Sequence, residues 1–434
     1  MSGPASDPPA RAGTGTLAPL RLAPFRFLLA GRSINALGNA IAPIALAFAV
    51  LDLTGSPSDL GLVVGARMLV NVVFLLFGGA LADRVPKHLL MVGASVAAAL
   101  TQAAVAALVL SGTATVALLI ALSAVNGMVG ALALPASAAI VPQLVPADIR
   151  QQANALNRLF LNGAVIIGAP VGGVIVATAG PGWGIAIDAA TFGLSAVAFA
   201  LLRLPSAGTA PAAGAARGSI VTDLRTGWTE FRSRTWLWVV VAGFAVINAA
   251  LSGGISVLGP VVADDTVGRR AWGLVLAAQT VGMVLGAVLA LRIRVSRLLF
   301  LGVLCTAFEV LPMLTLGAVP HLGLLLGAAF LAGAGIEQFS VAWETTMQEH
   351  IPTDRLARVY SYDMVGSFVA IPIGQVVAGP IAEAVGVESA LVGAAALIAL
   401  AVAGMLSSGA VRNLRHRLPT SAEAATATME ESAA

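Results

Sequence analysis

The chain has 434 residues, of which 58% are hydrophobic and only 10% are Asp, Glu, Lys or Arg. A soluble globular protein has roughly 25% charged residues, so this composition excludes both a soluble enzyme and a disordered chain. The net charge of +3 is too small for a nucleic-acid-binding face, and we expect no nucleic acid as a partner.

Long apolar segments follow a Pro-, Ala- and Gly-rich start, residues 1–23, which is predicted to be a disordered cytoplasmic tail. A helix needs about 20 apolar residues to cross a bilayer, and the sequence supplies twelve such segments. Their apolar runs are unbroken rather than alternating, which predicts helices and excludes a β-barrel. The segments lie at 28–51, 60–82, two within 89–147, 153–178, 184–203, 237–262, 272–291, 298–317, 323–345, 358–381 and 389–410.

The positive charges predict the orientation of these spans. With both termini in the cytoplasm, twenty of the 24 Lys and Arg residues fall on the inside. The outside loops then carry only Arg269 and Arg270, while Arg32 and Arg67 fall within spans. Because cytoplasmic loops are enriched in positive charge, we expect an all-α, multi-pass protein of the plasma (cytoplasmic) membrane with both termini inside.

The longest internal polar segment, residues 204–235, predicts the division into domains. It separates an N-terminal six-helix bundle, 24–203, from a C-terminal six-helix bundle, 236–410, which is followed by a cytoplasmic tail, 411–434. Trp228 and Phe231 lie among charged residues near the end of this linker, and this pattern predicts a short amphipathic helix on the membrane surface.

The two halves repeat each other at a nearly constant offset. Gly168 corresponds to Gly374 at an offset of 206 residues, and Asp52 corresponds to Asp264 at an offset of 212. Arg67 likewise corresponds to Gln279. Parallel six-span repeats predict two bundles around an axis along the membrane normal, with a substrate site between them near the middle of the membrane.

The turn after the second span, Gly78-Gly79-Ala80-Leu81-Ala82-Asp83-Arg84-Val85-Pro86-Lys87, is similar to the loop motif of the major facilitator superfamily. The segments 141–146, 151–157 and 343–348 resemble the exporter branch of that superfamily, which includes the enterobactin exporter and the macrolide efflux proteins (transmembrane secretion effectors). The fifth span carries Gly168-Ala169-Pro170-Val171-Gly172-Gly173, which resembles the antiporter motif Gly-Pro-x-x-Gly-Gly with its proline one place late.

This resemblance implies a major facilitator fold and a secondary active transporter. We expect export of a small amphipathic molecule of drug, antibiotic or siderophore type by proton-coupled alternating access, with the chain acting as a monomer in the lipid bilayer. An importer of a small solute and a transport-inactive membrane sensor or scaffold are the alternatives. No phosphate-binding loop for ATP is present, and the four histidines lack metal-ligand spacing, so we expect neither an enzyme nor a cofactor or metal.

Charged and polar residues within the spans are the candidate site, because ionisable groups in a membrane are costly and usually functional. Glu337 lies deep in the tenth span beside glycines, and Asp363 begins the eleventh, so both are candidates for proton coupling. The resemblance implies a cytoplasmic gate loop, to which we assign Gly79, Asp83, Arg84 and Glu344, with Asp363 adjoining it. The candidate substrate cavity comprises Arg32, Asn35, Asn39, Arg67, Asn248 and Gln279.

Three further features carry expectations. Arg67 is expected to meet an anionic group of the substrate or a carboxylate such as Glu337. Asp188, in the sixth span, is expected near the outer surface in contact with water. The glycines and proline of residues 253–260 predict a break or kink in the seventh span. In the fifth span, the glycines at 168, 172 and 173 allow close helix packing, and Pro170 bends the helix locally.

Overall fold

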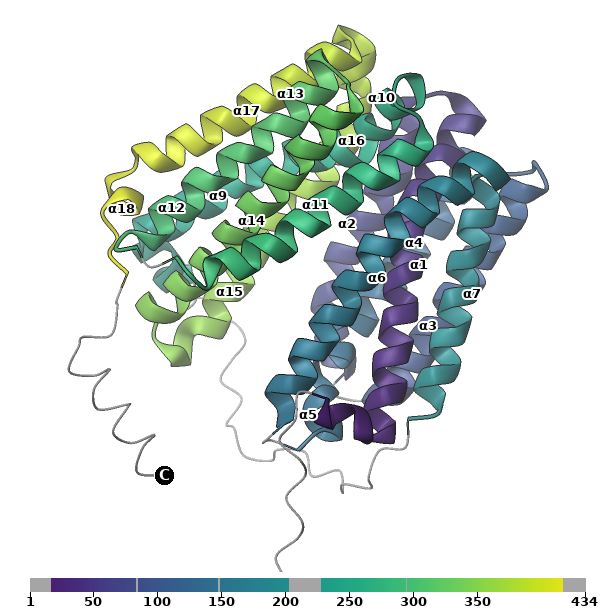
Figure 1. Ribbon diagram of the computed structural model, residues 1–434, viewed down its shortest axis with the longest axis horizontal. Helices are drawn as coiled ribbons and strands as arrows, with labels where there is room; N and C mark the ends of the chain where they lie inside the picture. Colours follow the sequence, from purple (N-terminus) through teal and green to yellow (C-terminus); the bar gives the residue numbers. More distant parts are fainter. Residues whose placement is uncertain (1–16, 83–84, 147–148, 203–227, 294, 417–434) are drawn as a thin grey trace, which may run out of the picture. The chain divides into compact units, whose positions relative to one another are not determined.

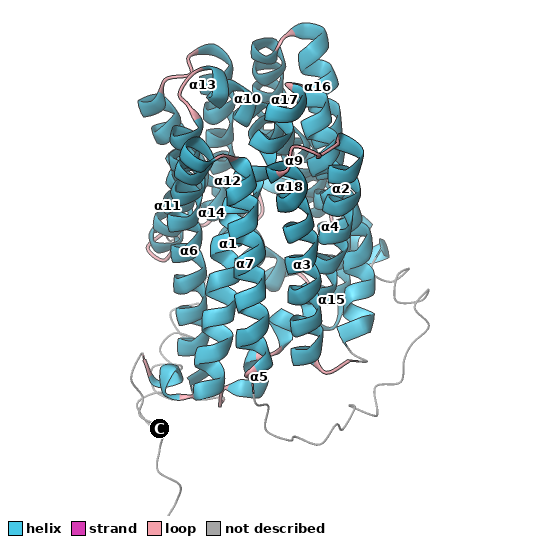
Figure 2. Ribbon diagram, turned by 90° about the vertical axis from the view of Figure 1, so that its right-hand side faces the viewer, coloured by secondary structure: helices cyan, strands magenta, loops and turns pink. Residues whose placement is uncertain are grey.

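The computed structural model describes residues 17–82, 85–146, 149–202, 228–293 and 295–416. In these ranges the regular structure is helical throughout (Figure 2). Twelve helices are long and apolar enough to cross a membrane, and they coincide with the twelve predicted segments. The prediction of an all-α membrane protein with twelve spans is confirmed.

The first six spans are single helices (Figure 1). A short turn of 3-10 helix, η1 (Ala18–Arg21), precedes them, and the short α5 (Val141–Leu144) lies between the fourth and fifth spans. The spans are α1 (Ala23–Thr54), α2 (Pro57–Ala82), α3 (Lys87–Leu110), α4 (Val116–Ala139), α6 (Arg150–Ala179) and α7 (Pro181–Ala200).

Three of the last six spans consist of more than one helical segment. The seventh comprises α9 (Thr235–Leu251), η3 (Ser252–Leu258) and α10 (Gly259–Asp265); the ninth comprises α12 (Leu298–Cys305), η4 (Thr306–Glu309) and α13 (Val310–Ala318); the eleventh comprises α15 (Thr353–Phe368) and α16 (Ala370–Val385). The others are α11 (Arg269–Ala290), α14 (Leu322–His350) and α17 (Val387–Ser407), after which α18 (Gly409–Arg412) follows.

The seventh span is widened rather than broken. Its middle segment η3 is a π-helix, so helical structure continues from α9 through to α10. The glycines here accommodate neighbouring side chains: a Cβ on Gly254 would lie 2.3 Å from Met313 Sδ, and one on Gly259 would lie 2.3 Å from the Trp272 ring. A π-turn inserts an extra residue into the helix without interrupting it. The predicted break is therefore absent here, and the alternative, a kink, stays a prediction.

The chain forms two compact units: residues 1–49 with 66–211, and residues 50–65 with 212–434. The short stretch 50–65 belongs to the second unit because it lies directly against α16. A Cβ on Gly61 would come within 2.3 Å of the Gln375 carbonyl oxygen, and a Cβ on Gly379 within 2.4 Å of Ser58 Cα. The bundle boundaries at 24–203 and 236–410 stay predictions.

Each unit contains an equivalent close contact between two helices. In unit 1, α4 meets α2 where a Cβ on Gly127 would lie 2.2 Å from the Arg67 carbonyl oxygen. In unit 2, α14 meets α11 where a Cβ on Gly333 would lie 2.0 Å from the Gln279 carbonyl oxygen. These four positions correspond in the sequence repeat, so the repeat preserves a helix–helix contact that only glycine permits.

The residues after the linker pack against the eleventh span. Trp228 and Phe231 lie in a short helix. Their rings contact the ring of Tyr362 in α15, with ring centroids 5.6 Å apart for Trp228 and 5.9 Å apart for Phe231. In the same helix, the Glu230 carboxylate accepts a hydrogen bond of 2.7 Å from Arg355. The predicted amphipathic helix is therefore bound to α15 by aromatic and ionic contacts.

Candidate polar pocket in the first unit

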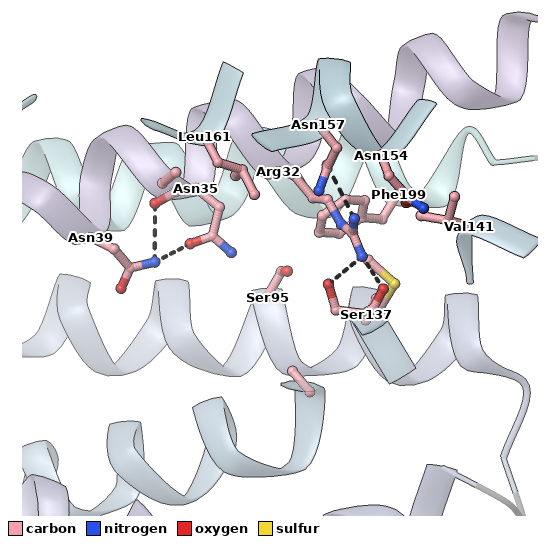
Figure 3. A pocket seen from close by; sticks show the side chains of 13 residues that line it. Arg32, Asn35, Asn39, Ser95, Ser137, Val141, Asn154, Asn157, Leu161 and Phe199 are labelled. Carbon is pink, nitrogen blue, oxygen red and sulfur yellow. Dashed lines mark hydrogen bonds between the residues drawn. The ribbon is translucent and has the colours of Figure 1, made fainter. Parts of the chain in front are cut away.

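Unit 1 contains a cavity of about 470 Å³ with a polar wall (Figure 3). An adjoining cavity of about 220 Å³ shares several of its wall residues and extends the polar surface to Arg67 and Asn126. The larger cavity is lined by Arg32, Asn35, Ala36, Asn39, Met91, Ser95, Ala133, Ser137, Val141, Asn154, Asn157, Leu161 and Phe199. Four of the predicted cavity residues, Arg32, Asn35, Asn39 and Arg67, thus line this pair of cavities.

The Arg32 guanidinium is held by two neighbouring helices (Figure 3). Its Nη1 donates a 3.1 Å hydrogen bond to Asn157 Oδ1 on α6. Its Nη2 donates to Ser137 on α4, both to the hydroxyl oxygen at 2.9 Å and to the backbone carbonyl. Arg32 is therefore fixed by neutral oxygen acceptors inside the bundle and does not extend to the cytoplasmic surface.

Two asparagines one helical turn apart form the next part of the wall. The Asn39 amide donates to the backbone carbonyl of Asn35 at 3.0 Å and also to its side-chain oxygen. Residues at i and i+4 share one face of a helix, so both amides lie on the same side of α1 as the cavity. They supply hydrogen-bonding groups beside Arg32.

Arg67 lies near an acidic residue of unit 1. Its guanidinium interacts electrostatically with the Asp188 carboxylate of α7. Asp188 is fully buried, with 0% exposure, and accepts a hydrogen bond from Gln102 of α3, the helix against which α7 packs. The expectation that Asp188 is in contact with water is wrong, because α1 and α3 enclose this carboxylate; its place near the outer surface stays a prediction.

The predicted cavity residues of unit 2 have other partners. The Asn248 amide donates to the Ser367 carbonyl oxygen at 2.9 Å, which connects α9 to α15. Gln279 lies where α11 packs on Gly333 of α14, and its side chain is half-buried. Asn248 therefore acts in the structure as a helix-connecting residue.

The proposed proton-coupling acids also lie in unit 2. Asp363 accepts a 3.0 Å hydrogen bond from the Trp343 indole and a 3.3 Å hydrogen bond from the Ser367 hydroxyl. Glu337 is half-buried within α14, and Glu344 is exposed on the same helix. Their roles stay predictions.

The gate loop falls largely outside the described residues. Asp83 and Arg84 lie in the gap between α2 and α3, and the surroundings of Gly79 are outside the described part as well. In the fifth span, by contrast, the glycines lie directly against α1: a Cβ on Gly168 would approach Leu37 O to 2.9 Å, and one on Gly172 would approach Ile41 Cα to 3.0 Å. Pro170 lies inside α6, and Gly173 is buried.

Several pocket residues were not among the sequence candidates. Ser137, Asn154 and Asn157 line the larger cavity, and Asn126 lines the smaller one. Asn154 and Asn157 of α6 are three residues apart, which places both on one helix face, and this spacing could have identified them from the sequence. Glu309 is a further buried acid, 1% exposed on η4, and its Oε2 has no hydrogen-bond partner among the described residues.

The sequence is similar to those of known membrane transporters. The family model described as Major Facilitator Superfamily matches residues 28–375. The chain is 27% identical over 390 residues to the multidrug efflux pump Tap of Mycolicibacterium fortuitum, covering 86% of this chain and 91% of that protein. It is also 27% identical over 381 residues to YfiS of Bacillus subtilis (strain 168), described as an uncharacterized MFS-type transporter, covering 84% and 88%.

Solved structures agree on the fold. The crystal structure of the nucleoside transporter NupG matches with a TM-score of 0.71 at 13% identity, covering 88% of this chain and 98% of that one. A bacterial homologue of the human lysosomal transporter Spinster matches with a TM-score of 0.69 at 16% identity, covering 90% and 97%. At these identities the likeness shows the architecture alone.

Proposed function

The chain belongs to the Major Facilitator Superfamily, a family of membrane transporters and not of enzymes, and from that premise we propose that it exports a small amphipathic organic molecule. Drugs, antibiotics and siderophores are the class of cargo. The observation that carries export is the similarity to the efflux pump Tap, which extends over most of both chains. The finer resemblance to the enterobactin and macrolide exporter branch is part of the same proposal.

Export by this fold needs a driving force, and we assign it to protons. Glu337 lies within α14, and Asp363 lies at the indole of Trp343. A carboxyl group inside a membrane span can exist with or without its proton, so it can couple proton binding to a change of conformation. Alternating access would then load the cargo from the cytoplasm and release it outside.

The wall of the unit 1 pocket supports an amphipathic cargo. It combines amides, hydroxyls and a guanidinium with apolar side chains such as Leu161 and Phe199. Ligand pockets in general pair a mostly apolar wall with a few polar groups that fix orientation. A cargo with an apolar body and a polar end matches this wall.

Transport into inverted membrane vesicles tests the proposal. A proton gradient is imposed, and the uptake of dyes and antibiotics is compared between the wild type, Glu337→Gln and Asp83→Asn. We expect gradient-dependent uptake by the wild type and its loss in Glu337→Gln, because the amide cannot release a proton. Glu388→Gln is the matched control, since Glu388 is exposed at the start of α17 and should be replaceable.

The outcomes separate the parts of the proposal. Uptake that survives Glu337→Gln places the coupling proton elsewhere, and Asp363→Asn is then the next variant. Cargo movement in the opposite direction, out of the inverted vesicles along with protons, would identify an importer. The absence of gradient-dependent movement for every compound in the wild type would contradict proton-driven export of this class.

A further inference from the structure

We propose that Arg32 is an oxyanion-binding subsite, so that the cargo carries a carboxylate, phenolate or similar negative group beside its apolar body. This inference rests on the proposed function and names the charge class of the cargo. It follows from a difference between two arginines of unit 1, Arg32 and Arg67, which line adjoining cavities.

The two arginines differ in their counter-ions. Arg67 interacts electrostatically with the buried Asp188 carboxylate, so an opposite charge lies near it inside the bundle. Arg32 has neutral hydrogen-bond acceptors: within the described residues they belong to Ser137 and Asn157. The positive charge of Arg32 therefore has no carboxylate partner in the part of the chain that the structure describes.

Arg32 also retains hydrogen-bonding capacity. A guanidinium has five N–H donors, and three of them are used toward Ser137 and Asn157. Nε has no partner among the described residues but is buried out of reach of the pocket, so the N–H of Nη1 that is left over is the donor free for a ligand. An unused donor on a cation held in a fixed orientation suits an oxyanion, since hydrogen bonds that involve a charged group are about twice as strong as neutral ones.

The rest of the pocket favours an anion over a cation. None of the thirteen lining residues is acidic, whereas Asn154, Asn157 and Ser95 can all donate hydrogen bonds. Met91, Leu161 and Phe199 supply apolar surface in the same cavity. A cationic group would be repelled by Arg32 and would find no carboxylate on this wall, while an anionic amphiphile satisfies both kinds of surface.

Binding measurements with three probes of one shape test the inference. The full-length protein, held in nanodiscs of zwitterionic phosphatidylcholine, which has no net charge, is titrated with 2-naphthoate, 2-naphthamide and 2-naphthylmethylammonium. We expect the wild type to bind the anion about tenfold more tightly than the amide, the factor that corresponds to ~1.4 kcal/mol. The ammonium probe should bind most weakly of the three.

Variants then assign this preference to one arginine. Arg32→Gln should abolish the preference for naphthoate, and Arg32→Lys, which keeps the charge, should retain part of it. The double variant Arg67→Gln/Asp188→Asn is the matched control and should leave the preference unchanged, because it removes the opposite charges of two interacting residues together. Asp188→Asn should strengthen naphthoate binding, since it frees the Arg67 charge beside the same pocket.

Two results would overturn the inference: equal binding of all three probes by the wild type, or loss of the anion preference in the double variant Arg67→Gln/Asp188→Asn but not in Arg32→Gln. The Arg32→Lys and Asp188→Asn results keep the test decisive where Arg32→Gln does not fold. No proton gradient is involved, so the outcome is separate from export. If the vesicles fail to export while the protein still binds naphthoate, the proposed function is contradicted and the anion-binding subsite is still supported.

Discussion

Arg269 binds Asp52 and Asp264, two acids that occupy equivalent positions in the sequence repeat. Its Nη1 and Nη2 donate to the Asp52 carboxylate at 3.0 and 2.5 Å, and its Nε and Nη2 donate to the Asp264 carboxylate at 2.7 and 2.9 Å. A single guanidinium thus joins the end of α1 to α10 within unit 2. Because all three side chains are partly exposed, water and salt screen the interaction.

Loss of this arginine should destabilise the protein by a modest amount. Arg269→Gln removes the charge from both carboxylates and leaves the two acids without their common partner. Partly exposed ion pairs contribute up to about 1 kcal/mol each, so we expect a lower melting temperature in detergent, with a larger loss than in Asp52→Asn or Asp264→Asn. Thermal unfolding followed by tryptophan fluorescence measures this difference.

The neighbouring Arg270 provides the control. It has the same side chain and is exposed at the start of α11, so Arg270→Gln should leave the melting temperature nearly unchanged. High salt should reduce the difference between Arg269→Gln and the wild type, since it screens the same charges. Equal melting temperatures for the Arg269 and Arg270 variants at low salt would contradict a stabilising role for this contact.

The spans were predictable because the thickness of a bilayer sets the length of an apolar helix. Glycine contacts were partly predictable from the sequence repeat. Gly168 of α6 lies against Leu37 of α1, and its repeat equivalent Gly374 lies against Ala249 of α9. The sequence repeat predicted the correspondence of these glycines. It could not identify the partner helix, which is set by packing between segments far apart in the chain.

Partners of the polar residues were the least predictable feature. The position of Asp188 along its span suggested contact with water, yet its burial depends on which helices enclose it, and those are α1 and α3. Asn248 shows the same limit, since its polarity suggested a cavity, while its amide donates to Ser367 of α15. Sequence gives the depth of a residue in the membrane, and lateral packing decides what it contacts.

The repeated glycine contacts predict that the effect of a glycine-to-alanine substitution on stability depends strongly on its position within α14. Gly333→Ala would place a methyl group 2.0 Å from the Gln279 carbonyl oxygen, so the backbones of α14 and α11 would have to separate. Overpacking of this kind costs typically 1–3 kcal/mol. We expect a lower melting temperature and a lower yield of folded protein, measured by size-exclusion chromatography and thermal unfolding.

A second glycine of the same helix is the matched control. A Cβ on Gly327 would meet nothing within 4 Å, and alanine is a better helix former than glycine, so Gly327→Ala should be neutral or slightly stabilising. Gly127→Ala in unit 1 should repeat the loss seen for Gly333→Ala, because the two contacts are equivalent. If Gly333→Ala were as stable as Gly327→Ala, this result would contradict a close contact between α14 and α11 at Gly333.

The ion pairs of Glu230 predict a pH dependence of stability. Hydrogen bonds from Arg234 and then Arg355 hold the pKa of the Glu230 carboxyl below its usual value of 4.5. A carboxyl whose pKa is lowered by folding stabilises the folded state above the unfolded pKa, and this contribution is lost as the pH falls through the folded pKa. Glu230→Gln should therefore lower the melting temperature at neutral pH.

The difference between Glu230→Gln and the wild type should narrow as the pH is taken below 4.5, the pKa of the unfolded side chain. Below the folded pKa both proteins carry an uncharged side chain at this position, so their melting temperatures should converge. The measurement is thermal unfolding of both proteins over a series of acidic buffers, with Glu388→Gln as the exposed control. A difference that stays constant down to the lowest pH would show that the variant acts through side-chain packing, and not through the charge of Glu230.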